Sequence, residues 1–143
     1  MAFQPGQDLT AERLNRFTPR FFYVQASAAL DGPASSVLVP GCSVTFTTTT
    51  ANAIYEADIA VDFDLNAAAT ALCSARLSVD GSLANAYAVL QGAAATDRGT
   101  SAQHYQGALA AAGSHTLTIV GTVATGQSIN VYTTLRVKVY EVV

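Results

Sequence analysis

From residue 21 onward, apolar and polar residues alternate along most of this chain. The clearest stretch is residues 55–65, YEADIAVDFDL, where apolar residues hold every second position and acidic residues hold most of the others. Successive side chains of a β-strand point to opposite faces, so the pattern predicts a strand with a core face and an acidic face. Residues 128–142, SINVYTTLRVKVYEV, predict one long strand whose outward side carries Arg136 and Lys138. If these two strands are neighbours, their acidic and basic patches pair.

The same alternation predicts further strands over residues 21–29, 42–49, 70–80, 85–91, 105–110 and 114–121. Turn signals separate them, the strongest being Asp80-Gly81, because glycine accepts the positive φ of a tight hairpin. Further turns are expected at residues 31–33, 40–41, 111–114 and 125–127. About eight strands at this spacing are typical of sandwiches and jelly rolls. We therefore predict an all-β antiparallel β-sandwich of jelly-roll type with a short N-terminal helix.

That helix is predicted within QPGQDLTAERLNRF, residues 4–17. Thr10 is suited to be its N-cap, and Glu12 falls where the helix dipole favours an anion. Leu9 and Leu14 have the spacing of a hydrophobic staple. Pro19 ends the helix, because the residue before a proline is pushed out of the α region. A helix of about two turns is marginal in water on its own, so it has to dock on something.

The chain therefore divides into an N-terminal arm, residues 1–20, and a sandwich domain, residues 21–143. Apolar and charged side chains are mixed in the arm, which suits a segment that grips a partner or a neighbouring copy. The residues expected to anchor it are Phe3, Leu9, Glu12, Arg13, Leu14, Arg16 and Phe17. The alternative is that the helix folds back over one open end of its own sandwich.

Charged residues make up 12% of the chain, about half of the roughly 25% that is usual in soluble domains. Thr, Ser, Ala and Gln must therefore fill many outward positions. Such a surface suits contact between subunits, because few ionic groups lose their water when it is covered. We expect a homo-oligomer, with a monomer of unusual surface as the alternative.

Several partner classes and cross-links are not expected. The net charge of -3 offers no electrostatic footprint for nucleic acid. No apolar run approaches the ~18 residues of a membrane span, and the start of the chain has no secretory signal pattern, so synthesis and assembly in the cytoplasm are expected. Cys42 and Cys73 lack metal-ligand spacing and are expected to be buried free thiols rather than a disulfide.

No catalytic, metal or cofactor site is predicted. The only carboxylate cluster lies along one strand, where same-face side chains stand about 6.6 Å apart, too far for one strand to close a cation cage. His104 and His115 are not accompanied by a nucleophile motif such as G-x-S-x-G. We therefore expect a protein that is not an enzyme.

A glycan-binding surface is the alternative from another class. Sugars stack on exposed aromatic rings, and Tyr87, Tyr105, Tyr132 and Tyr140 are the candidate platforms, although tyrosines often bridge core and rim instead. Residues 95–103, ATDRGTSAQ, form the longest polar insertion, expected to be either a contact loop or a plain connector. The candidate surface contacts are Arg98, Tyr105 and Tyr132.

Residues 5–15, PGQDLTAERLN, resemble the opening of many tailed-bacteriophage virion proteins, in which a Pro-Gly turn leads into a helix ahead of a β-rich region. The match covers about a tenth of the chain, and the alternating region from residue 21 onward is similar in pattern to phage jelly-roll heads. The resemblance implies a non-enzymatic structural protein on the virion surface, attached by its arm. It would be a capsid decoration, a tail fibre or a minor tail component, in contact with capsid or tail proteins. Three-fold packing is usual in such proteins, which makes a homotrimer the expected oligomer.

Overall fold

The computed structural model describes residue 11 and residues 18–66 and 71–141, and the elements it defines in them are β-strands. The predicted N-terminal helix lies outside the described residues except at Ala11, and all seven anchoring residues lie outside them, so both stay predictions. In the part of the chain that is described, no helix is long and apolar enough to cross a membrane.

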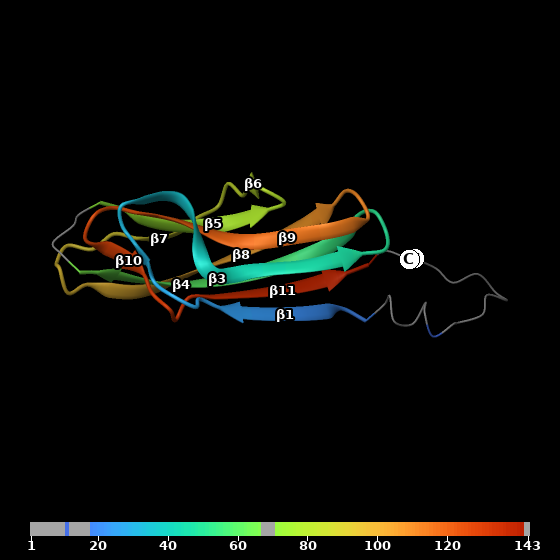
Figure 1. The fold of residues 1–143 in the computed structure, drawn as a ribbon, viewed down its shortest axis with the longest axis horizontal. Coiled ribbons are helices and arrows are strands. Elements are labelled where there is room, and N and C mark those ends of the chain that lie inside the picture. The colour runs from blue at the N-terminus through green and yellow to red at the C-terminus, as the bar shows by residue number, and fades with distance from the viewer. Residues whose placement is uncertain (1–10, 12–17, 67–70, 142–143) are drawn as a thin grey trace.

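The described strands form two antiparallel sheets that lie face to face (Figure 1). The first sheet contains β1 (Arg20–Gln25), β11 (Thr134–Tyr140), β4 (Ala53–Leu65), β10 (Gln127–Ile129) and β2 (Leu30–Asp31), with β8 (Arg98–Leu109) on the other edge of β4. The second sheet contains β3 (Ala34–Thr48), β9 (Gly113–Val123), β5 (Cys73–Val79) and β6 (Ser82–Leu83), with β7 (Ala88–Leu90) also paired to β5. The predicted all-β sandwich is confirmed.

With β2, β6 and β10 set aside, the strand order is that of a jelly roll. The sheets then run β1-β11-β4-β8 and β3-β9-β5-β7. In chain order the first strand therefore lies beside the last, and successive strands cross repeatedly from one sheet to the other. Most contacts consequently join residues that are far apart in the sequence.

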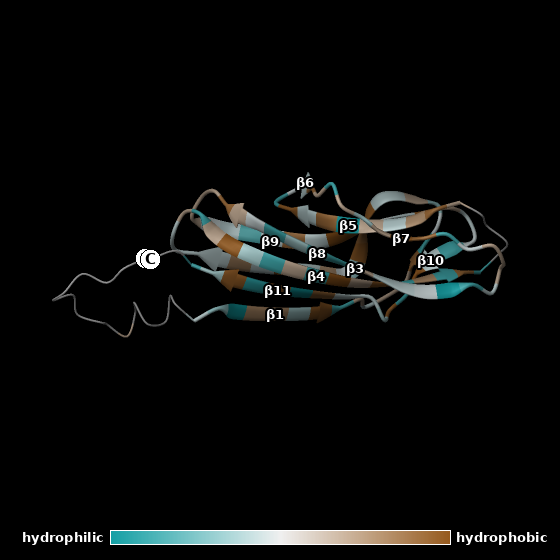
Figure 2. Ribbon diagram, turned by 180° about the vertical axis from the view of Figure 1, so that it is seen from behind, coloured by the Kyte–Doolittle hydropathy of each residue, from teal (hydrophilic) through white to brown (hydrophobic). Residues whose placement is uncertain are grey.

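The core lies between the two sheets and is built from the inward set of alternating residues. Along β4 most inward positions are fully buried, and four of the outward positions are acidic, which gives the alternation of colour along the strand in Figure 2. The largest fully buried apolar side chains are Phe63, Ile59, Leu65, Leu77, Leu117, Ile119, Ile129, Leu135, Val39, Val61 and Val137. Cys42 and Cys73 are buried free thiols, as predicted, and burial raises the pKa of Cys42 to about 11.

Three predicted elements are wrong in their extent. The long strand over residues 128–142 is two strands, β10 and β11, because a turn closes between them with the Thr133 amide donating to the Asn130 carbonyl at 3.1 Å. The predicted contact loop over residues 95–103 belongs largely to β8, which pairs with β4 from Arg98 onward. Finally, β3 continues through the turn predicted at residues 40–41, where the register with β9 shifts instead.

The hairpin predicted at Asp80-Gly81 is confirmed, since β5 and β6 flank these two residues and both have positive φ. The Asp80 carboxylate holds this hairpin against β9. Its Oδ2 lies 2.7 Å from Nδ1 of the buried His115, and its Oδ1 accepts the Thr116 amide at 2.7 Å. The other ring nitrogen of His115 lies 3.0 Å from the Ala111 carbonyl. Both contacts of the ring are hydrogen bonds only when each nitrogen carries a proton.

This clasp predicts a pH dependence of stability. Burial opposes ionisation of Asp80, but the hydrogen bonds from His115 and Thr116 outweigh it and hold the pKa of the Asp80 carboxyl below its usual value. Ionised Asp80 therefore stabilises the fold fully above the unfolded pKa of about 3.9, and this contribution is lost as the pH falls through the lower folded value. Asp80→Asn is expected to lower the free energy of unfolding at about pH 6, with a difference from wild type that shrinks toward about pH 2.

Urea unfolding at a series of pH values measures this difference. Asp31→Asn is the matched control, because Asp31 is an exposed carboxylate without a hydrogen-bond or ionic partner among the described residues. It should follow the wild-type pH profile. A deficit of Asp80→Asn that stays constant over the whole range would contradict a role for the ionised carboxylate.

Candidate functional site

The outward side of the first sheet carries most of the ionic side chains of the described domain, and we call it the charged face. It comprises Phe21, Tyr23, Arg136, Lys138, Glu56, Asp58, Asp62, Asp64, Arg98 and His104. The two patches lie on neighbouring strands as predicted, with Arg136 opposite Asp58 and Lys138 opposite Glu56. Lys138 forms the predicted ion pair with Glu56, whereas Asp58 is bound by His104 instead of Arg136. The Lys138 ammonium is 3.5 Å from the Glu56 carboxylate. The Tyr140 hydroxyl and Glu56 both raise the pKa of Lys138.

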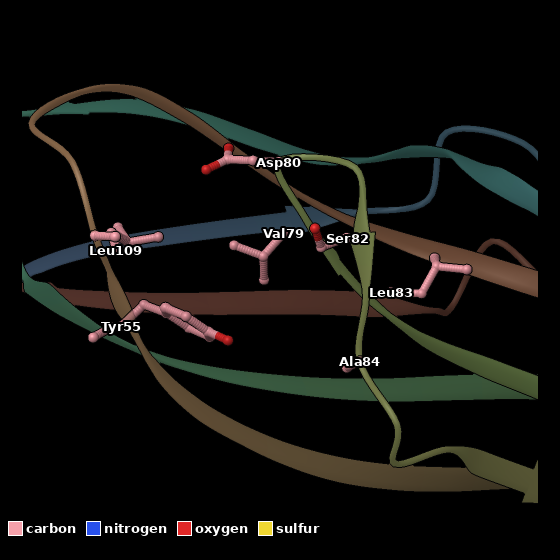
Figure 3. A pocket seen from close by; sticks show the side chains of 9 residues that line it. Tyr55, Val79, Asp80, Ser82, Leu83, Ala84 and Leu109 are labelled. Atoms are coloured by element: carbon pink, nitrogen blue, oxygen red, sulfur yellow. The ribbon is translucent and has the colours of Figure 1, made fainter.

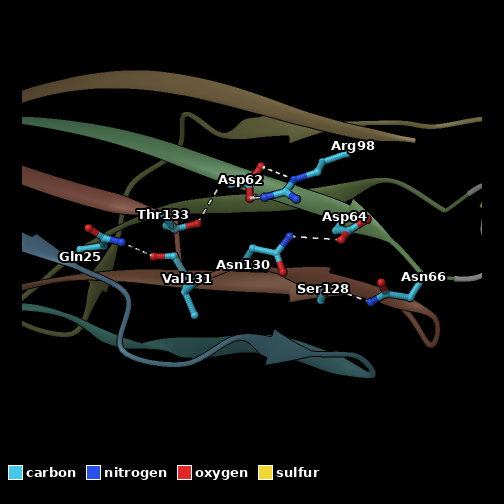
Figure 4. Close-up of polar contacts among 9 residues, drawn as sticks. All are labelled: Gln25, Asp62, Asp64, Asn66, Arg98, Ser128, Asn130, Val131 and Thr133. Atoms are coloured by element: carbon cyan, nitrogen blue, oxygen red, sulfur yellow. Dashed lines mark hydrogen bonds and ion pairs between the residues drawn. The ribbon is translucent and has the colours of Figure 1, made fainter. Parts of the chain in front are cut away.

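Asp62 and Arg98 form the best-defined ion pair of the charged face (Figure 4). The Asp62 side chain is only 7% exposed, and Arg98 covers it with two hydrogen bonds, Nε to Oδ1 at 3.2 Å and Nη2 to Oδ2 at 2.6 Å. This paired geometry fixes the plane of the guanidinium. The same hydrogen bonds raise the pKa of Arg98. Asp62 is held in turn by its own backbone, whose amide donates to the Thr133 hydroxyl at 3.0 Å.

The ring of Tyr132 lies against this fixed guanidinium, with the Arg98 Cζ 5.2 Å from the ring centroid. Tyr132 is 64% exposed, because it sits in the turn between β10 and β11 rather than inside a strand. Two of the three predicted surface contacts, Arg98 and Tyr132, are therefore brought together by the fold. We call this pair the Tyr132 platform.

Further polar contacts lie beside the Asp62–Arg98 pair, toward the end of β4 and along β10 (Figure 4). The Asn130 amide donates to the Asp64 carboxylate at 3.3 Å, and the Asn66 amide donates to the Ser128 hydroxyl at 3.0 Å. Asp64 has no cationic partner in ion-pair contact among the described residues. An exposed ring beside carboxylate, amide and guanidinium groups can stack on one face of a ligand and hydrogen-bond its edge.

Tyr105, the third predicted surface contact, is wrong as a platform. Its side chain points inward from β8, is only 7% exposed, and donates from its hydroxyl to the Ala86 carbonyl at 2.9 Å. Burial raises the pKa of this hydroxyl. Tyr105 is thus a structural tyrosine that ties the segment before β7 to the core. The large exposed rings that sequence reasoning missed are Phe21 and Tyr23, which are 65% and 60% exposed on β1.

The strands of the second sheet are almost free of charge, and we call their outward side the neutral face. Arg76 is the only Asp, Glu, Lys or Arg in β3, β5, β6, β7 and β9. Where residues 43–47 of β3 pair with β9, the outward positions are hydroxyl side chains, and the Thr45 and Thr116 oxygens are 3.0 Å apart. Around Arg76 the neutral face is more apolar and contains a cavity of about 310 Å³.

A second hollow of about 380 Å³ opens between the sheets, where the β5–β6 hairpin faces the end of β8 (Figure 3). The Tyr55 side chain projects into it from β4, with Val79, Leu83 and Leu109 on its apolar walls and Asp80 at its margin. Because Asp80 is already bound to His115 and Thr116, the hollow offers a ligand mainly the hydroxyl groups of Tyr55 and Ser82 for hydrogen bonding.

The histidines are placed in structural contacts. His104 lies on the exposed side of β8 with its Nδ1 2.7 Å from Asp58, and His115 belongs to the hairpin clasp. Within residues 18–66 and 71–141, no three His, Cys, Asp or Glu side chains gather as a metal site would require. The expectation that the chain is not an enzyme stays a prediction.

The sandwich has two distinct ends. At the arm end, where β1 begins and β11 ends, Arg20 donates to the Thr47 carbonyl at 2.8 Å and pairs with Glu141 at 2.9 Å. Glu141 also accepts hydrogen bonds from the amide and the hydroxyl of Thr49. The free end lies opposite, where β4 ends and β8 begins (Figure 1). The Tyr132 platform lies toward this end, because Arg98 is the first residue of β8 and Tyr132 precedes β11.

No family model and no curated protein matches the chain. Among solved structures, it is similar to dimeric latent PorU from Porphyromonas gingivalis, with a TM-score of 0.54 and 10% identity over 86% of this chain, which spans 13% of PorU. Weaker similarities join it to the CBM36-1 domain of a multidomain xylanase from the hindgut metagenome of Trinervitermes trinervoides, with a TM-score of 0.44 and 14% identity over 82% of this chain and 96% of that domain. CBM35 from Cellvibrio japonicus Abf62 has a TM-score of 0.42 and 13% identity over 85% of this chain and 99% of that domain. The likeness to PorU shows the β-sandwich fold, and the weaker similarities add no argument about function.

Proposed function

We propose that this chain is a non-enzymatic surface module of a tailed-phage virion, attached to the capsid or tail by its N-terminal arm. The observation that carries the proposal is the asymmetry between the two ends of the sandwich. The chain enters at the arm end through a pinned residue, Arg20, while the Tyr132 platform lies toward the opposite end, at the start of β8. An anchored module needs these two different ends, because the surface that attaches it to the particle must be separate from the surface that it exposes.

The surface next to the arm supports the same role. β1 is an edge strand that follows directly on residues 1–19, and it presents Phe21 and Tyr23 to solvent. Exposed aromatic side chains of this size are enriched at protein interfaces. Because β1 follows the arm directly in the chain, we propose that the arm and this aromatic edge meet the same surface of the particle.

Removing residues 1–19 while keeping Arg20 is expected to leave a folded sandwich that no longer joins the particle, because every described core contact lies beyond the deletion. Circular dichroism and urea unfolding check the fold, and immunoblotting of purified virions checks incorporation. A matched pair refines the test. Leu9→Ala, Leu14→Ala and Phe17→Ala combined should reduce incorporation, whereas Gln4→Ala, Gln7→Ala and Asn15→Ala combined should not. A truncated chain that incorporates normally would refute the anchoring role.

The neutral face supports assembly of several copies. Covering the threonine-rich part of β3 and β9 strips water from hydroxyl groups rather than from ions, which costs less free energy. The outward residues there are Ser43, Thr45, Thr47, Thr116 and Thr118. We therefore propose this part of the neutral face as the contact between copies, with a trimer as the expected assembly.

Light scattering of the full chain is expected to give a multiple of 14.8 kDa. Thr47→Glu should lower the mass toward the monomer, because it would bury a carboxylate without a partner. The control is Thr100→Glu, which adds the same charge on the charged face, on β8. A monomer at micromolar concentration, or equal behaviour of the two variants, would contradict this contact.

Glycan binding is the second candidate function, and the Tyr132 platform favours it. Its ring is exposed, its guanidinium is fixed by Asp62, and Asp64 and Asn130 supply hydrogen-bonding groups beside it. Such a ring stacks on the apolar face of a sugar, while the polar groups form hydrogen bonds with the sugar hydroxyls.

On a glycan array, Tyr132→Ala is expected to weaken binding by up to about tenfold, the equivalent of the ~0.5–1.5 kcal/mol that a ring contact contributes. Tyr23→Ala is the matched control, since Tyr23 is equally exposed but lies on β1. Equal losses in both variants, or no binding to any glycan, would rule out the platform as a sugar site.

A further inference from the structure

Arg76 is a cation isolated in a neutral surface. It is the single Asp, Glu, Lys or Arg among the strands of the second sheet, and its side chain points outward from the middle of β5. No carboxylate lies within ion-pair distance of Arg76 among the described residues. A cation with neither an ionic partner nor other charged residues around it requires another explanation.

The contacts of Arg76 fix its position without using up its donors. Nη1 donates to the Ala84 carbonyl at 3.2 Å, and Cζ lies 4.6 Å from the centroid of the Tyr87 ring. Arg98 differs, because its guanidinium is engaged by both oxygens of Asp62. In Arg76 further N–H groups remain for an acceptor that lies outside the described fold.

This guanidinium lines the cavity of about 310 Å³ on the neutral face, at the side where β5 begins and β9 ends. The volume lies at the lower end of the range for small-molecule sites. Leu72 and Val89 give the cavity exposed apolar walls. Its hydroxyl groups come from three strands, through Ser36, Ser74 and Thr122.

The backbone at one wall is held in an unusual conformation. Ser36 has φ of 53°, in the left-handed region, and lies where the register of β3 against β9 shifts. Its amide donates to the Thr122 hydroxyl oxygen at 3.0 Å, which leaves the proton of that hydroxyl for another acceptor. Residues in this conformation persist where the surroundings hold them, often at ligand sites.

We propose that this cavity binds a carboxylate-bearing sugar, such as a uronic acid or a sialic acid. A planar carboxylate matches the free edge of the guanidinium, and one cation balances one negative charge. A phosphate monoester carries about 1.5 to 2 negative charges at neutral pH, more than this single cation balances. The apolar walls contact the C–H face of a sugar ring, and the three hydroxyl side chains reach its hydroxyl groups. The site is separate from the Tyr132 platform, and it goes beyond the proposed role on the particle.

Isothermal titration of the full chain with sodium glucuronate, sodium galacturonate, N-acetylneuraminate and glucose tests the proposal. At least one of the acids is expected to bind and glucose is not, with binding that weakens as NaCl is added. Arg76→Gln should reduce affinity for that acid about tenfold or more, because it removes the charge-assisted hydrogen bonds. The affinity of Arg76→Lys should lie between those of wild type and Arg76→Gln, because lysine keeps the charge and loses the planar guanidinium.

A control makes the result specific. Arg136→Gln removes a cation that has no ion-pair contact among the described residues but lies on the charged face, and it should bind like wild type. The proposal is overturned if none of the acids binds at millimolar concentration, if glucose binds equally well, or if Arg76→Gln binds as wild type does. Particle incorporation plays no part in the measurement, so either idea can fail without the other.

Discussion

The strand β4 is the element on which the rest of the sandwich depends. It is paired with β8 along one edge, and with β11 and β10 end to end along the other. Its inward residues form the centre of the core, while its outward positions carry the four carboxylates of the charged face. Glu56, Asp58 and Asp62 have counterparts in Lys138, His104 and Arg98 from the strands on either side, and Asp64 accepts a hydrogen bond from Asn130. The charged face is thus a consequence of β4 being both a core strand and the strand with the most carboxylates.

The features that the sequence predicts well are those governed by period-two alternation and turn chemistry. Alternation of side chains between the two faces accounts for the extent of β4 and for the meeting of Arg136 and Lys138 with the acidic stripe. The turn residues account for the Asp80-Gly81 hairpin. The free, buried state of Cys42 and Cys73 follows from their apolar surroundings. The alternation also placed Tyr132 outward, whereas Arg98 was predicted to lie in a loop. The contact between the two depends on a turn that brings Tyr132 over the start of β8.

The features that the sequence did not predict depend on contacts between distant segments. Residues 98–103 carry few apolar side chains, so they suggest a loop, yet pairing with β4 makes them a strand. The turn after Asn130 contains neither glycine nor proline, and nothing local interrupts the pattern of alternation there. Tyr105 points inward because its hydroxyl finds a backbone carbonyl at the rim. Arg76 stands out only once the five strands of its sheet are known to carry no other Asp, Glu, Lys or Arg.

The Arg20 clasp has a mechanical consequence. The longer strands run along the long axis of the molecule, and both β1 and β11 meet the arm end (Figure 1). Antiparallel hydrogen bonds lie perpendicular to their strands. A pull between a tether at Arg20 and a load at the opposite tip would therefore strain the β1–β11 ladder in shear, across all its rungs together, rather than peel them apart singly. Such a geometry suits a protein held at one end while its tip is dragged.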